Sequence, residues 1–249
     1  LVIVVSLGFS INIDSGSAEQ PFSSWWQFLP LVFKQPPVTQ TPTPIPSPTP
    51  VVPTPVGPVG GTFTSLAVDP NQNDNLYAGH YGSGVYKSFD KGETWYLMSS
   101  GLDNRTIQSL ATHPSDTNIV YAGTHGGGVY KSTNAGNSWS ASNGGVIGNH
   151  IVYDIEIDPT NPNRIYIATR ISGSLVGYVY KSTNAGASWT LIFKGDVFNT
   201  PDYFYDIDID PLNSNYLYLS AHEHGFYKST NAGQSFFAIN NGVTDLSAR

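Results

Sequence analysis

One eleven-residue motif returns four times in this chain, and it restricts the possible folds more than any other feature. The copies occupy residues 85–95, 129–139, 179–189 and 226–236, and the first reads Val-Tyr-Lys-Ser-Phe-Asp-Lys-Gly-Glu-Thr-Trp. Asp or Asn stands two residues before Gly in every copy, a pattern that favours a tight turn because both side chains accept backbone N–H bonds and Gly accepts a positive φ. Each copy therefore predicts a β-hairpin whose closing aromatic side chain is buried.

The motif recurs with a longer period, because its serines at 88, 132, 182 and 229 are 44, 50 and 47 residues apart. A proline precedes a tyrosine by seven residues in every unit: Pro70 and Tyr77, Pro114 and Tyr121, Pro159 and Tyr166, Pro211 and Tyr218. Repeats of this length are typical of propeller blades or solenoid units. No stretch has a useful helical period, so we expect four strands in each unit and radially arranged sheets.

The pattern Ser-x-Asp-x-Gly-x-Thr-Trp resembles the Asp-box, or BNR repeat, of sialidase-like β-propellers. The first copy matches it in full, and the later copies carry Asn at the Asp position. The resemblance covers the chain from about residue 60 onward and implies an all-β fold, a β-propeller of four-stranded blades. We interpret the motif residues as structural, because turn formation explains each of them: Ser88, Asp90, Gly92, Trp95, Ser132, Asn134, Gly136, Trp139, Ser182, Asn184, Gly186, Trp189, Ser229, Asn231, Gly233 and Phe236.

The spacing predicts a propeller domain at 59–249 with four blades. Their expected bounds are about 60–103, 104–147, 148–198 and 199–241. Residues 242–249 are similar to the segment that leads into the second blade. Propellers of this kind usually have six to eight blades, so we expect these four to belong to a larger ring, with a further blade starting at residue 242.

The first 58 residues differ in composition from the repeats. Residues 1–13 are apolar but too few to span a bilayer, and we interpret them as a truncated signal peptide or membrane anchor rather than a buried strand. Residues 14–35 form a spacer, and residues 36–58 are a Pro/Thr-rich linker that predicts a semi-rigid polyproline-II conformation. This arrangement indicates an exported, cell-surface protein with N-terminal association with the membrane or cell envelope.

A formal charge of −7 argues against a nucleic-acid partner, which requires clustered Lys and Arg. The chain has no cysteine and therefore no disulfide framework. We expect no cofactor and no metal, and a glycan or protein ligand at the cell surface.

The connection between the second and third strands changes from blade to blade while the strands beside it keep their spacing, as binding loops do. Counting back from the motif serine places Tyr81, His125 and His222 at one equivalent position, and the longer third loop contributes Arg170. We predict these four as binding residues, because aromatic, imidazole and guanidinium groups stack on sugars and bind carboxylates. The alternatives are a solvated loop without a ligand, or a metal held by the His-Glu-His sequence at 222–224.

Carboxylates alternate along the first strands of the third and fourth blades, in Asp-Ile-Glu-Ile-Asp at 154–158 and Asp-Ile-Asp-Ile-Asp at 206–210. Alternation places them on one face of each strand. Glycoside hydrolysis requires a carboxylate pair, so Asp154 and Asp206 are candidates, although no residue is assigned as catalytic. The alternative is that these carboxylates accept hydrogen bonds from neighbouring strands or pair with cations near the channel.

Three groups of relatives are compatible with the repeats. Sialidases use an Arg-Ile-Pro motif that this chain lacks. Xyloglucanase-type glycoside hydrolases have blades similar to residues 79–88, but Tyr81 and His125 replace the acidic residue they use. The third group, which includes photosystem II assembly factors, sortilin-type receptors and exported bacterial propellers, is non-catalytic. We therefore expect a surface-tethered binding or scaffolding module; the alternative is a xyloglucanase-like hydrolase whose catalytic residues lie partly outside these blades.

Overall fold

The computed structural model describes residues 60–144, 147–195 and 202–246. They form four antiparallel sheets of four strands each, which confirms the expected all-β propeller blades. None of these described residues belongs to a helix long and apolar enough to cross a membrane. The predicted signal peptide or anchor at 1–13, the spacer at 14–35 and the linker at 36–58 lie outside the described residues.

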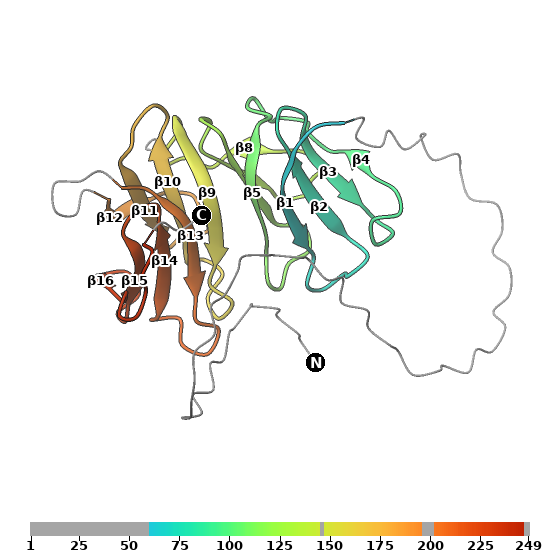
Figure 1. Cartoon of the computed structure of the whole chain (residues 1–249). Coiled ribbons are helices and arrows are strands. Elements are labelled where there is room, and N and C mark those ends of the chain that lie inside the picture. The colour runs from blue at the N-terminus through green and yellow to red at the C-terminus, as the bar shows by residue number, and fades with distance from the viewer. Residues whose placement is uncertain (1–59, 145–146, 196–201, 247–249) are drawn as a thin grey trace, which may run out of the picture. The chain divides into compact units, whose positions relative to one another are not determined.

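The strands of each sheet follow one another in chain order, so each blade is a meander (Figure 1). The first two blades contain β1 (Phe63–Val68), β2 (Leu76–His80), β3 (Gly84–Ser88), β4 (Tyr96–Leu97), β5 (Ile107–Thr112), β6 (Val120–Thr124), β7 (Val129–Ser132) and β8 (Ser140–Ala141). The other two contain β9 (His150–Ile157), β10 (Ile165–Ile171), β11 (Gly177–Ser182), β12 (Thr190–Lys194), β13 (Phe204–Ile209), β14 (Leu217–Ala221), β15 (Gly225–Ser229) and β16 (Phe237–Ala238). The first strands of successive blades pack beside each other, β1 with β5, β5 with β9 and β9 with β13.

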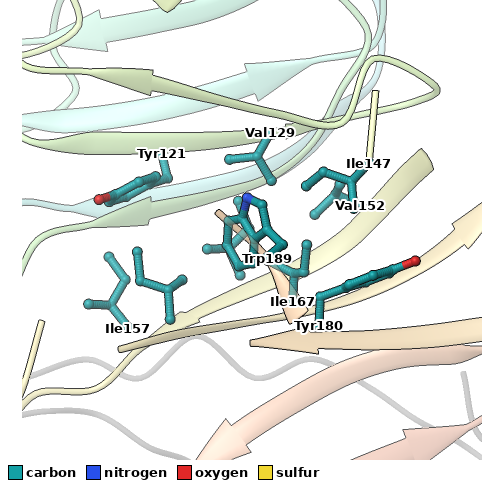
Figure 2. Packing of buried hydrophobic residues seen from close by; sticks show 10 residues of the cluster. Tyr121, Val129, Ile147, Val152, Ile157, Ile167, Tyr180 and Trp189 are labelled. Atoms are coloured by element: carbon teal, nitrogen blue, oxygen red, sulfur yellow. The ribbon is translucent and has the colours of Figure 1, made fainter. Parts of the chain in front are cut away.

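The hydrophobic core consists of the layers between successive blades. Between the second and third blades, Tyr121 and Val129 pack against Ile167 and Trp189, all of them buried (Figure 2). Trp189 also donates its indole N–H to the carbonyl of Ser142 in the preceding blade, 2.7 Å away. The indoles of Trp139 and Trp189 both donate to a carbonyl of the preceding blade, so these motif side chains point inward as the hairpin interpretation predicts.

The motif turns show why Asn replaces Asp without changing the hairpin. In the first blade Asp90 Oδ1 accepts the backbone N–H of Thr94 at 2.8 Å and the hydroxyl of Ser88 at 2.7 Å. In the second blade the amide oxygen of Asn134 accepts the N–H of Ser138 at 2.8 Å. An oxygen acceptor is enough for this turn, and Asn supplies one.

Every first strand contains a β-bulge near its start. The register with the second strand shifts between Phe63 and Ser65 in β1, and β5, β9 and β13 shift at the equivalent place. The extra residues are Thr64, Gln108, Tyr153 and Tyr205. A bulge re-aims the side chain of the extra residue, and bulges often lie beside functional sites.

Candidate ligand-binding rim

Four side chains occupy one equivalent position where the second strand of each blade ends. The backbone N–H groups of Tyr81, His125 and His222 each donate to a carbonyl just before the bulge, at 2.9, 2.8 and 2.9 Å. In the third blade Arg170 pairs with Ile151, and its register along β10 matches that of the other three. The binding residues predicted from the sequence therefore lie on one edge of the blades, which we call the rim.

Aromatic rings gather around the rim position between the third and fourth blades. The rings of Tyr153 and Tyr203 stack with centroids 6.0 Å apart, and His222 stacks on Tyr203 at 4.5 Å. Tyr205 meets Tyr203 edge-on at 5.1 Å. The guanidinium of Arg170 lies over Tyr203, 4.9 Å from the ring centroid. We call these five residues the rim cluster; all are half-buried, so their outer atoms remain open to a ligand.

Two hydroxyl groups of the rim cluster, those of Tyr153 and Tyr203, have a raised pKa. The Tyr203 and Tyr205 hydroxyl oxygens are 3.0 Å apart, and either one can donate to the other. Burial raises the pKa of Tyr203, and the neighbouring Tyr205 raises it further. Burial likewise raises the pKa of Tyr153. The Tyr153 and Tyr203 hydroxyls therefore keep their protons at neutral pH, and they can both donate and accept hydrogen bonds beside the guanidinium of Arg170.

The first two blades contribute a smaller aromatic pair to the rim. Tyr81, 52% exposed, meets His125 edge-on with ring centroids 6.0 Å apart. The bulge residue Gln108 lies 3.1 Å from Nδ1 of His125 through its amide nitrogen. In the first two blades, as in the other two, a bulge residue therefore contacts a rim residue.

The two histidines of the His-Glu-His sequence have different neighbours. His224 Nδ1 lies 2.7 Å from the buried carboxylate of Asp202, whereas His222 stacks within the rim cluster. The described part of the chain holds no group of three His, Cys, Asp or Glu side chains placed to bind a metal ion. Asp202 also accepts the N–H of Tyr203 at 2.8 Å, which anchors the strand that carries the cluster.

Asp154 connects two blades through a hydrogen bond. Its Oδ2 accepts the backbone N–H of Ile207 on β13 at 3.1 Å, which is the strand-bonding alternative predicted from the sequence. Burial between the blades raises the pKa of Asp154, and the charge of Asp206 raises it further. Burial and Asp154 together raise the pKa of Glu156 to about 8. Asp206 is exposed, so the two candidate carboxylates lie in different environments.

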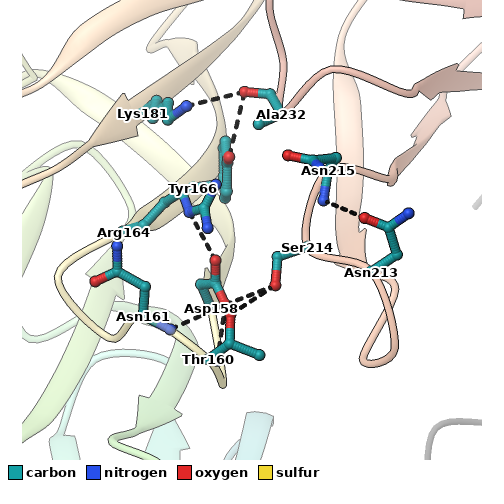
Figure 3. A network of polar contacts seen from close by, with 10 residues as sticks. All are labelled: Asp158, Thr160, Asn161, Arg164, Tyr166, Lys181, Asn213, Ser214, Asn215 and Ala232. Atoms are coloured by element: carbon teal, nitrogen blue, oxygen red, sulfur yellow. Dashed lines mark hydrogen bonds and ion pairs between the residues drawn. The ribbon is translucent and has the colours of Figure 1, made fainter.

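The last carboxylate of each run forms a turn, as the sequence indicated. Asp158 accepts the backbone N–H of Thr160 at 2.8 Å and the hydroxyl of Ser214 in the next blade at 2.9 Å (Figure 3). Its other oxygen pairs with Arg164 at 2.6 Å. Asp210 accepts the N–H of Leu212 at 2.9 Å. These acids therefore hold the loop between the first and second strands.

Sequence reasoning identified the rim positions but missed the three tyrosines of the cluster. Tyr153 and Tyr205 directly precede the two acidic runs, where the first two blades have Thr64 and Gln108. That alignment can be made from the sequence. The bulge that turns these side chains toward the rim cannot be predicted in the same way, because it depends on the pairing of two strands.

The comparisons with known proteins agree on the repeat and the fold. The family described as "Sortilin, neurotensin receptor 3" matches residues 83–195. No curated protein sequence matches the chain.

Solved structures with the same fold include enzymes and a binding protein. One is the crystal structure of an ancestral GH74 enzyme, whose sequence is 30% identical to this chain. The match covers 72% of this chain and 24% of the enzyme, with a TM-score of 0.65. GH74 from Niastella koreensis is 26% identical, with a TM-score of 0.56 over 70% of this chain and 29% of that one. An auxiliary nutrient binding protein from Bacteroides thetaiotaomicron VPI-5482 is 15% identical in sequence. The match covers 68% of this chain and 38% of that protein, with a TM-score of 0.51, and this similarity supports the fold and not the function. The chain spans less than a third of the length of the two enzymes.

Proposed function

We propose that this chain, a member of the Asp-box (BNR-repeat) β-propeller superfamily, is an extracellular, surface-tethered binding module that holds a glycan on its rim. A protein ligand at the same rim is the other form of this proposal.

The rim cluster is the observation that carries the proposal. It combines half-buried rings, tyrosine hydroxyls and one guanidinium within contact distance of each other. Sugars offer apolar C–H faces and many hydroxyls, so a site for them needs ring surfaces together with groups that both donate and accept hydrogen bonds. The cluster supplies both, and Arg170 adds a partner for an acidic sugar.

Affinity electrophoresis in gels containing xyloglucan or polygalacturonate tests this proposal with the full chain. The double variant His125→Ala, His222→Ala should bind at least about tenfold more weakly, equivalent to about 1.4 kcal/mol. The control is His113→Ala, a histidine in the turn after β5. Unchanged retardation of the rim variant, or equal loss in the control, would contradict the proposal.

The second candidate function is polysaccharide hydrolysis, which the similarity to GH74 enzymes favours. Asp154, whose pKa is raised by burial, has the character of a general acid, and the ionisable Asp206 is its nearby partner. Release of reducing sugar from either polysaccharide, lost in the variant Asp154→Asn, Asp206→Asn, would establish the enzyme. Binding without such release would leave the binding module as the function.

The extracellular location has its own test. We expect protease added to intact cells of the source organism to remove the blades. Protection of the blades until the cells are lysed would contradict an exposed, tethered protein.

A further inference from the structure

Arg170 brings a permanent positive charge to the rim cluster, and no carboxylate among the described residues pairs with it. Its Nη1 makes one long contact, 3.4 Å to the carbonyl of Ser174, and the hydroxyl of Tyr153 is its other polar neighbour. Its Nε is buried and has no hydrogen-bond partner. A guanidinium has five N–H donors, so the charge and several donors of Arg170 remain uncompensated.

Other charged residues of the described segments do not share this environment. Arg164 pairs with the buried carboxylate of Asp158 at 2.6 Å. Glu223, the acid next to the rim position of the fourth blade, lies 3.6 Å from Nδ1 of His222 rather than beside Arg170. Arg170 is therefore a half-buried cation for which residues 60–144, 147–195 and 202–246 supply no negative partner.

The longer loop of the third blade holds Arg170 in this position. Fourteen residues separate Tyr166 from Tyr180, whereas nine separate the equivalent tyrosines in each of the other blades. Within the loop, the backbone N–H of Ser174 donates to the carbonyl of Ile171 at 2.9 Å. This local turn places the Ser174 carbonyl beside the guanidinium of Arg170. The extra residues of the third blade thus support the cation.

The groups around Arg170 suit a sugar that carries an acid. The ring of Tyr203 contacts both Arg170, whose guanidinium lies 4.9 Å from the ring centroid, and His222, which stacks at 4.5 Å. The hydroxyl oxygens of Tyr203 and Tyr205 are 3.0 Å apart. A hexuronate residue presents the matching groups, because it has an apolar C–H face, several hydroxyls and one carboxylate.

The uncompensated charge favours an acidic sugar over a neutral one. A neutral sugar that covered Arg170 would displace water from an unpaired cation and return only neutral acceptors, which costs free energy. A carboxylate compensates the charge and accepts two parallel N–H bonds, each about twice as strong as a bond between neutral groups. The cost of the wrong ligand and the gain from the right one both contribute to specificity.

The charge of the whole chain makes this preference local to the cluster. With a formal charge of −7, the chain as a whole repels a polyanion rather than attracting it. Binding of an acidic polysaccharide therefore depends on cations at the contact itself. In the rim cluster that cation is Arg170.

We propose that the rim cluster binds a hexuronate residue of an acidic polysaccharide, with the sugar carboxylate on the guanidinium of Arg170. The sugar ring lies against the tyrosine rings and bonds to their hydroxyls. This proposal rests on the binding function proposed above and names the class of glycan. Arg170 is the specificity-determining residue in this assignment, whereas Tyr203 and Tyr205 contact the sugar whatever its charge.

Isothermal titration calorimetry of the full 249-residue chain with oligogalacturonides and with their methyl esters tests the proposal. The two probes share the same sugars and differ in the charge of the carboxyl groups. The wild type should bind the acid at least about tenfold more tightly than the ester. In Arg170→Gln this preference should disappear, and Arg170→Lys, which keeps the charge without the planar fork, should retain only part of it.

Two controls accompany these variants. Lys91→Gln removes an exposed ammonium from the motif turn of the first blade and should keep the wild-type preference. Near-ultraviolet circular dichroism verifies that each variant is folded. The comparison of the two probes on the wild type needs no variant, so it decides the proposal even where a substitution disturbs the fold.

The outcomes separate this proposal from the binding function on which it rests. Equal binding of acid and ester by the wild type would leave a glycan-binding rim and overturn the hexuronate assignment. A preference that persists in Arg170→Gln would overturn it as well, and so would dextran sulfate that competes as strongly as the oligogalacturonides, since the site would then accept any anion. No binding of either probe, with no retardation by xyloglucan, would contradict the binding function itself.

Discussion

The hydroxyl of Tyr121 in the second blade donates to the backbone carbonyl of Ala185 in the third, 3.0 Å away. Tyr121 is fully buried, and its residue position follows Pro114 by seven, as every such tyrosine follows its proline. The regular spacing of the sequence thus places one tyrosine hydroxyl of each of the first three blades against the motif turn of the next blade. The blades are joined by specific hydrogen bonds as well as by apolar packing.

Removing the hydroxyl of Tyr121 should lower stability, because the hydrogen bond to the carbonyl of Ala185 is lost. Tyr121→Phe should reduce the free energy of unfolding by about 0.5–1.5 kcal/mol, as loss of one hydrogen bond does. The control Tyr81→Phe removes a hydroxyl from a side chain that is 52% exposed and should have almost no effect. Urea denaturation measures both variants, and equal losses would contradict a stabilising role for the hydrogen bond between Tyr121 and Ala185.

Replacing the aromatic residue of the motif should lower stability most where that residue is buried against a neighbouring blade. Trp139 is 5% exposed and donates to the carbonyl of Met98, so Trp139→Ala should cost about 3–5 kcal/mol. Trp95 has no described blade before it and is half-buried, so Trp95→Ala should cost clearly less. Thermal melts of the two variants decide this, and a larger loss for Trp95→Ala would refute the assignment.

The motif turn should tolerate Asp in place of Asn134, but it should not tolerate a residue without the side-chain oxygen that accepts the N–H of Ser138. Asn134→Asp keeps the acceptor for the N–H of Ser138 and should leave stability nearly unchanged. Asn134→Ala removes that acceptor and should cost about 1–2 kcal/mol, as loss of a comparable capping side chain does. Chemical denaturation of both variants tests this, and an equal effect would show that the side-chain oxygen is unimportant.

Stability should fall as the pH rises from about 4 to about 8. Burial and Asp154 raise the pKa of Glu156 to about 8, whereas an unfolded glutamate titrates near 4.3. In this window folded Glu156 keeps a proton that the unfolded glutamate has released, so each increase in pH lowers the contribution of Glu156 to folding stability. Glu156→Gln should flatten the dependence, and Glu93→Gln, at an exposed turn, should not. A slope unchanged by Glu156→Gln would contradict the role of burial.

The blades were predictable because the repeat encodes each turn locally. Ser88, Asp90 and Gly92 form their hairpin through bonds within five residues, so the sequence shows them directly. The rim position of His222 also followed from counting along the strand. The stacking of Tyr203 on His222 did not, since it depends on a bulge in β13 and on the bond that Asp202 makes to the chain.

Hydroxyl-radical footprinting with bound polysaccharide tests the central claim, that the rim cluster is the binding site. The full chain is labelled with and without xyloglucan or polygalacturonate, whichever retards it in the gel. The oxidation of Tyr203 and Tyr205 is compared with that of Tyr96, on the outer strand β4. We predict protection of Tyr203 and Tyr205 by the polysaccharide and no change at Tyr96. Protection of Tyr96 alone, or of no tyrosine while binding persists, would show that the ligand lies elsewhere.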